Sequence, residues 1–201
     1  IFAYAPLSTG ITYQLIPKAT ADGIAVHSMG YGRTSAKNGQ VFRNIFNFPV
    51  NYWDGASVAI NHLLDINGGN IKGKKVALVY HNSAYGKEPI RTLEELSTKH
   101  GYELSLLAVD HPGQEQKSQW LQIRRDKPDY VLMWGWGVMN QVAIKSAASI
   151  KFPMENFLAM NEAESQKNRD LHKKTFIQAL EGRNSKSAAH VTPFLSQVEF
   201  Q

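Results

Sequence analysis

Residues 74–86 constrain the fold of this chain more than any other stretch. Two lysines lead into the apolar run Val76-Ala77-Leu78-Val79-Tyr80, which ends at the polar turn His81-Asn82-Ser83. An amphipathic stretch follows, and this order is typical of a buried parallel strand that feeds a helix. Such a junction points backbone N–H groups and the positive helix end at whatever lies above the strand. The stretch therefore predicts an α/β fold and places Tyr85 in the turn above a strand end.

Composition limits the classes of protein to consider. The chain has 201 residues, 43% of them apolar and 19% charged, which is typical of a globular protein with a real core. No apolar run is long enough to span a bilayer, and the absence of cysteine excludes disulfides and thiol chemistry. The net charge is +5, but the cations are scattered and no recognition-helix or RNA-binding motif accompanies them. We therefore predict no nucleic-acid partner and no membrane insertion.

The remaining segments predict two series of βα units, which implies two doubly wound parallel sheets. The first series has a buried strand ending in residues 1–5, a helix that begins at Ser8 or Thr9 as N-cap, and a strand over 24–28. The second has strands over 74–81, 103–109, 129–134 and 156–159, with helices between them. We predict residues 1–40 as the remainder of a first ligand-binding lobe, 41–52 as an extended connector and 53–160 as a second ligand-binding lobe. Residues 161–201 are unassigned and partly helical.

The sequence motifs for catalysis and cofactor binding are not met. Residues 134–140 begin like a dinucleotide fingerprint, but Asn140 stands where the third glycine belongs and bulky Trp136 stands where the pyrophosphate must approach. No phosphate loop or Gly-x-Ser-x-Gly occurs, and the seven histidines lack metal-ligand spacing. His81 and His111 both follow strands, so each is either an acid–base group or a solvated or backbone-bonded imidazole. We predict no enzyme, no metal and no cofactor.

Ligands of open parallel sheets bind outside the carboxyl ends of the strands. Here these ends are rich in serine, glycine and aromatic residues. Ser8 and Thr9 either hold a carboxylate with their hydroxyls and helix N–H groups or only cap the helix. Tyr31, Tyr85 and Trp136 stand in turns and are candidates for an apolar wall, whereas core packing is the better interpretation for Trp134 on its strand.

Several ordered segments resemble one known family. They are Ser8-Thr9-Gly10, residues 41–53, residues 73–80, Tyr85-Gly86-Lys87, Ser118-Gln119, residues 127–131 and Trp134-Gly135. Together they resemble the type 1 periplasmic binding proteins, and most closely the branched-chain amino-acid and amide-binding components of ABC uptake transporters. The resemblance covers about residues 2–158.

The resemblance implies two lobes that close on a small ligand by a hinge motion. Ser8, Thr9 and the turn Ser28-Met29-Gly30-Tyr31 would lie on one side of the ligand, and Tyr85 and Trp136 on the other. It also implies an exported protein, periplasmic or extracellular, that delivers its ligand to a membrane permease. The alternative is the effector-binding domain of a receptor or regulator with the same fold, and a third class is a doubly wound enzyme.

This sequence departs from the family pattern in three ways. The opening βα units are absent before Ile1, and the later segments are not recognisable after Met160, so we expect a fold that is incomplete at both ends. The acidic residue that amino-acid-binding members carry after the Trp134 strand is also missing. A buried ammonium without a carboxylate is costly, so we expect a carboxylate or amide ligand with an apolar or aromatic body. A branched-chain amino acid stays an alternative, because Glu88 or Glu162 could pair with its ammonium.

Overall fold

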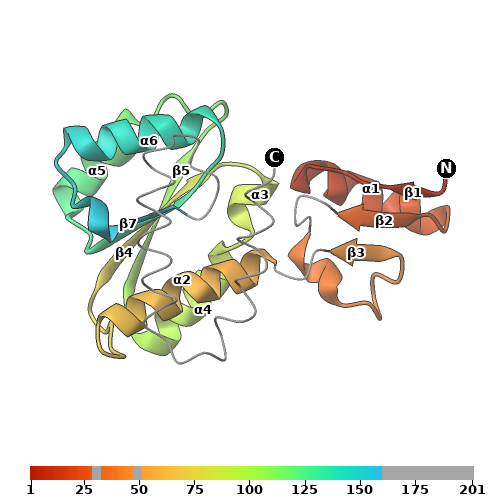
Figure 1. Cartoon of the computed structure of the whole chain (residues 1–201), viewed down its shortest axis with the longest axis horizontal. Coiled ribbons are helices and arrows are strands. Elements are labelled where there is room, and N and C mark those ends of the chain that lie inside the picture. Colours follow the sequence, from red (N-terminus) through yellow and green to blue (C-terminus); the bar gives the residue numbers. More distant parts are fainter. Residues whose placement is uncertain (29–32, 48–50, 160–201) are drawn as a thin grey trace, which may run out of the picture. The chain divides into compact units, whose positions relative to one another are not determined.

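The computed structural model describes residues 1–28, 33–47 and 51–159. Strands and helices alternate along them, as the sequence predicts (Figure 1). The elements are β1 (Ala3–Tyr4), α1 (Thr9–Ala21), β2 (Ala25–Ser28), the 3₁₀ turn η1 (Thr34–Lys37), β3 (Ile45–Asn47), α2 (Tyr52–Ile66), β4 (Lys75–His81), α3 (Ala84–Lys87), α4 (Ile90–His100), β5 (Glu103–Val109), α5 (Lys117–Asp126), β6 (Tyr130–Trp134), α6 (Val138–Ser149), η2 (Met154–Asn156) and β7 (Phe157–Ala159).

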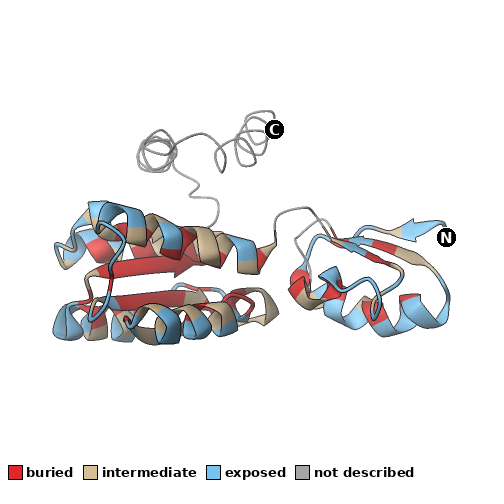
Figure 2. Cartoon of the chain, turned by 90° about the horizontal axis from the view of Figure 1, so that it is seen from below, coloured by how far each residue is buried: buried red, intermediate tan, exposed pale blue. Residues whose placement is uncertain are grey.

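The larger sheet has the order β5-β4-β6-β7, and all its strands are parallel. Helices α2 and α4 cover one face and α5 and α6 cover the other, so the buried strands lie between two helical layers (Figure 2). Successive side chains of β4 enter different cores: Val76 and Leu78 pack with α2 and α4, and Ala77 and Val79 pack with α5 and α6. The predicted α/β class with a doubly wound parallel sheet is confirmed.

The strand order sets where this sheet has its topological switch point. The connection from β4 to β5 carries α4 on one face, and the connections from β5 to β6 and from β6 to β7 carry α5 and α6 on the opposite face. The chain therefore leaves β4 and β6 in opposite directions, and the carboxyl ends at such a switch point are where ligands of this kind of sheet bind. The turns that follow these two strands, at 82–85 and 135–137, lie beside this switch point.

The smaller sheet has the parallel order β1-β2-β3. Its core is formed where Ile16 and Ala19 of α1 pack on Val26 and Ile45. Two expectations for this region are wrong. Residues 45–47 form a strand inside the stretch predicted as an extended connector; only Ile45 of it is buried, so its apolar alternation is too weak to reveal it. Residues 1–5 are not a buried strand end, because β1 has two residues and Ile1 and Phe2 are almost fully exposed.

Local sequence signals explain most helix ends. Asn51 forms a capping box with Asp54 at the start of α2. Pro89 occupies the N-cap position of α4, and Gly101 ends that helix in the left-handed conformation with φ 71°. Ser8 stands at the N-cap of α1 as predicted, but its side chain makes no capping hydrogen bond.

The proposed lobe boundaries at residues 40, 52 and 160 stay predictions. The predicted partial helix within residues 161–201 lies outside the described residues.

Gly86 lies against the end of β4 and provides a test of this packing. A Cβ built on Gly86 would be 1.8 Å from the carbonyl oxygen of His81, a backbone atom that cannot move without shifting the strand. We expect Gly86→Ala to lower the free energy of unfolding by about 3 kcal/mol or more, at the top of the range for overpacking. Chemical denaturation followed by circular dichroism measures the loss.

The matched control for this prediction is Gly39→Ala. A Cβ there meets nothing within 4 Å, and the φ of Gly39 is not positive. Its effect should stay within about 0.5 kcal/mol. Equal stability of the two variants would contradict the assigned role of Gly86.

Candidate functional site

Tyr85 lies at the carboxyl edge of the larger sheet, within the short helix α3 that follows β4. Its hydroxyl donates a long hydrogen bond of 3.4 Å to the carbonyl oxygen of Gly135, in the turn after β6. Its ring contacts Trp134, with the centroids 6.4 Å apart. Tyr85 therefore bridges the two strand ends that flank the switch point, and its half-buried ring forms part of the wall between them.

Tyr52 connects Tyr85 to the smaller sheet. Its ring meets the ring of Tyr85 edge to face at 5.3 Å, and the ring of Trp134 at 6.0 Å. Its hydroxyl forms a buried 2.9 Å hydrogen bond with the hydroxyl of Thr9 at the start of α1. The structure thus brings Thr9 and Tyr85, two predicted site residues, into contact with one shared residue.

The other predicted residues of the smaller sheet differ from one another. Ser8 is exposed and its hydroxyl is not used as a cap, so it is available to a ligand at the N-terminus of α1. Ser28 is fully buried, and its hydroxyl pairs with that of Thr12 at 3.2 Å, which favours a structural role. Met29, Gly30 and Tyr31 lie outside the described residues.

Trp136 lies in the turn after β6, beside two histidines. The centroid of its ring is 5.4 Å from that of His81 and 6.0 Å from that of His111, and the two imidazoles are 5.7 Å apart. Trp136 is 50% exposed, whereas His81 is 3% exposed beneath it. Burial, and then the neighbouring His111, lower the pKa of His81, while Asp110 acts in the opposite direction. His81 is therefore held neutral, with one ring nitrogen as donor and one as acceptor.

Buried polar atoms without a hydrogen-bond partner gather near the carboxyl edges of both sheets. Within the described ranges they include Oδ1 of Asn47 at the end of β3, both ring nitrogens of His81 at the end of β4 and Nε1 of Trp134 at the end of β6. Oγ1 of Thr34, at the start of η1, is a fifth such atom. An unsatisfied buried donor or acceptor costs about 1–3 kcal/mol. These edges therefore carry polar groups suited to a further binding partner.

Glu88, one of the two carboxylates considered for an ammonium, is already engaged. It is 8% exposed, Oε1 accepts a hydrogen bond from the hydroxyl of Tyr13, and Oε2 accepts one from the backbone N–H of Thr34 at 3.3 Å. Burial, and then the hydrogen bond to Glu88, raise the pKa of Tyr13. Glu162 lies outside the described residues.

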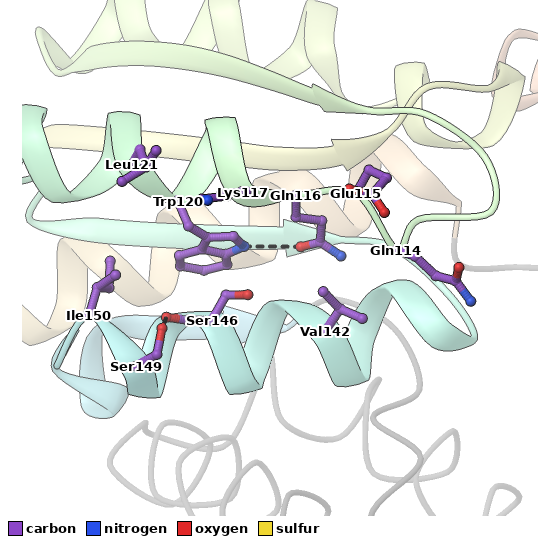
Figure 3. Close-up of a pocket in the computed structure, with 10 residues that line it drawn as sticks. All are labelled: Gln114, Glu115, Gln116, Lys117, Trp120, Leu121, Val142, Ser146, Ser149 and Ile150. Atoms are coloured by element: carbon purple, nitrogen blue, oxygen red, sulfur yellow. Dashed lines mark hydrogen bonds between the residues drawn. The ribbon is translucent and has the colours of Figure 1, made fainter.

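A groove of about 320 Å³ runs between α5 and α6 (Figure 3). Its lining includes Trp120, Leu121, Val142 and Ser146. The buried amide of Gln116 at its base is fully satisfied, because it accepts from Nε1 of Trp120 at 3.0 Å and donates to the carbonyls of Gly113 and Met139. No predicted site residue lies in this groove.

Metal ligation finds no support in the part of the chain that the structure describes, where no three His, Cys, Asp or Glu side chains are grouped suitably. In the same residues, no helix is long and apolar enough to cross a membrane.

Sequence reasoning missed three residues of this site. Tyr52 falls at the end of the predicted connector, Trp134 is interpreted as a core residue, and His81 is considered for acid–base chemistry and not for binding. Their positions at the first residue of α2 and at the ends of β4 and β6 are visible in the sequence. Their mutual contacts are not, because they depend on how the elements pack.

Comparison with known proteins identifies the relatives of this fold. The family model described as periplasmic binding protein matches residues 1–181. A solved structure described as an ABC transporter permease from the Pseudomonas fluorescens group is 38% identical, with a TM-score of 0.73 over 79% of this chain and 39% of that one. Comparison with curated proteins finds no match.

Two more distant structures share the fold. A branched-chain amino-acid ABC transporter protein from Thermus thermophilus, with bound valine, is 17% identical with a TM-score of 0.72, over 87% of this chain and 44% of that one. A solute-binding protein of an ABC transporter from R. palustris, in complex with benzoate, is 18% identical with a TM-score of 0.65, over 89% and 55%. The present chain therefore spans about two fifths to just over half the length of these three relatives.

The lowered pKa of His81 predicts how stability depends on pH. The unfolded chain titrates His81 near its ordinary value of about 6.5, whereas the folded chain binds that proton only at lower pH. Below about pH 6.5 the unfolded state therefore binds more protons, and the free energy of unfolding falls as the pH is lowered toward the folded-state pKa. We expect His81→Phe to reduce this fall, measured by urea denaturation between pH 7.5 and 5.

His100→Asn serves as the control for the loss of one histidine, because His100 lies at the far end of α4. His100→Asn should show the wild-type dependence of the free energy of unfolding on pH. If that dependence has the same slope in wild type and in His81→Phe, His81 contributes nothing to it.

Proposed function

The chain belongs to the periplasmic binding protein family, and on this premise we propose that it captures a small organic ligand as the substrate-binding component of an ABC uptake transporter. Relatives of this family are binding proteins of transporters and not enzymes. The proposal places the protein in the periplasm or outside the cell, where it would deliver its ligand to a membrane permease.

The observation that carries the proposal is the set of buried, unpartnered polar atoms near the carboxyl edges of the two sheets. In Asn47, His81 and Trp134 they lie at the ends of strands β3, β4 and β6. A hydrogen-bonding ligand at these edges would satisfy such groups and offset part of their cost. A fold with no binding role has no need of this arrangement.

The proposed ligand carries a carboxylate or amide on an apolar or aromatic body. The free hydroxyl of Ser8 and the N-terminus of α1 suit an anionic or carbonyl oxygen. The rings of Tyr85 and Trp136 suit an apolar body. A free amino acid fits less well, because Glu88 is occupied by Tyr13 and Thr34 and the turn after β6 carries no acidic residue.

Isothermal titration calorimetry of the full chain against benzoate, benzamide, L-leucine and L-valine tests this ligand class. We expect the aromatic acid or amide to bind more tightly than either amino acid, because a buried ammonium without a carboxylate partner is costly. Tight binding of leucine together with no binding of the aromatic compounds would contradict the assignment.

Tyr85 is the residue on which the proposed wall depends most directly. We expect Tyr85→Ala to weaken ligand binding at least about tenfold, as for a buried aromatic anchor, and Tyr85→Phe to weaken it less because the ring remains. Calorimetry with the tightest ligand of the panel measures both.

Leu121→Ala is the matched control for Tyr85→Ala. Leu121 is also apolar and partly exposed, but it lies in the groove between α5 and α6. Its replacement should leave the affinity unchanged. Unchanged affinity in Tyr85→Ala, or a loss in Leu121→Ala, would move the site away from the strand ends.

A further inference from the structure

His81 is buried in a way that its surroundings do not explain. It ends β4 with a side chain 3% exposed, and neither ring nitrogen has a hydrogen-bond partner within the described ranges. The backbone carbonyl of His81 accepts a 2.8 Å hydrogen bond from the N–H of Ser83 and lies close against Gly86. Keeping an unpaired imidazole here is costly, so a hydrogen-bonding partner beyond the described residues would stabilise it.

The rings beside the imidazole belong to side chains that reach solvent. His111 is exposed and lies 5.7 Å away, and Trp136 is 50% exposed and lies 5.4 Å away, centroid to centroid. Trp136 stands between two glycines; Gly137 has φ 58°, and a Cβ built on it would meet open space. Gly135 is closely packed against Met133 and Met139, so the room to adjust lies on the side of Gly137, and a turn there would move Trp136 off His81 while β4 and β6 stay in place.

We propose that His81 is a direct ligand contact, in which Trp136 moves off the imidazole on binding and a ring N–H of His81 donates a hydrogen bond to a carboxylate oxygen of the ligand. This inference rests on the proposed function, because it uses the same strand ends, and it deepens that function by naming the recognising atom and the anionic class of ligand. His81 thereby gains a hydrogen-bond partner that it lacks among the described residues.

A carboxylate is favoured over an amide because it can form a charge-assisted hydrogen bond with a protonated His81. The charged or titratable groups acting on it are His111 and Asp110, and the carboxylate of Asp110 accepts a 2.6 Å hydrogen bond from the side chain of Asn82. Burial and His111 lower the pKa of His81 in the free protein. A bound carboxylate raises that pKa again, so the imidazole takes up a proton from solvent and forms a charge-assisted hydrogen bond, about twice as strong as a neutral one.

Proton uptake on binding is the quantity that tests this inference. Benzoate and benzamide are titrated into the full chain at pH 7 in two buffers of different ionisation enthalpy. We expect the observed heat for benzoate to depend on the buffer and to correspond to uptake of up to about one proton. Benzamide, which has no charge to pair, should show no such dependence. The affinity for benzoate should fall as the pH is raised from 6 to 8, because the complex binds more protons than the free protein.

Two substitutions of His81 separate hydrogen bonding from protonation. His81→Phe keeps a ring against Trp136 but removes both nitrogens, and it should weaken benzoate binding about tenfold to a hundredfold and abolish proton uptake. His81→Asn keeps a donor that does not titrate, and it should retain more affinity while also losing the uptake. His100→Asn, remote on α4, should change neither, and thermal melts check that each variant is folded.

The outcomes distinguish this inference from the proposed function. Benzoate binding with no proton uptake, or with uptake that survives in His81→Phe, overturns the role of His81 and leaves the proposed function standing. Uptake removed by His111→Asn and not by His81→Phe assigns the contact to the other imidazole and equally overturns it. Absence of binding by every member of the ligand panel overturns both.

Discussion

Burial of β4 on both faces is the constraint on which the larger sheet depends. Val76 and Leu78 enter one core and Ala77 and Val79 the other, and each is at most 1% exposed. Burying a side chain of the size of valine or leucine contributes about 1.5–3 kcal/mol, so neither face can be left uncovered. Helices must therefore cover both faces, with α2 and α4 on one and α5 and α6 on the other, and the chain changes direction at the switch point between β4 and β6.

In the same arrangement, the strand ends are the part of the sheet where polar side chains can be placed. Within the sheet, backbone groups pair with neighbouring strands and side chains enter the apolar cores. The last paired residues at the carboxyl ends of β4, β6 and β3 are His81, Trp134 and, on the smaller sheet, Asn47. Each holds a buried polar atom that no other described residue satisfies. The stability supplied by the cores offsets the cost of these groups, so that a binding edge and a stable sheet coexist in one fold.

Periodicity and end signals were sufficient to predict most of the fold. The run at 75–81 has apolar residues at successive positions, as a strand buried on both faces requires, and Gly101 ends α4 where the sequence indicates. Strand β3 was missed because its three residues bury only Ile45. A pattern needs several buried positions to stand out, and the smaller sheet offers few of them.

The site was only partly predictable, because its members contact one another across the sequence. Turn residues such as Tyr85 and Trp136 could be selected from their positions after strands. The bond between Thr9 and Tyr52 joins residues 43 positions apart, and it depends on how the elements pack. No local pattern encodes such a pair. Sequence reasoning therefore indicates which edge of the sheet to propose as the site, whereas the atoms proposed to recognise the ligand follow only from the packed structure.

The contacts between the two sheet regions are of a kind that suits movement. They include the hydroxyl pair of Thr9 and Tyr52 and the two hydrogen bonds that Glu88 accepts from Tyr13 and Thr34. Hydrogen bonds contribute only about 0.5–1.5 kcal/mol net, because water replaces the lost partner. Separating the apolar cores would cost far more. A rearrangement around a ligand would therefore break these polar contacts first. Because Tyr52 contacts both Thr9 and Tyr85, a ligand beside either residue would affect its position.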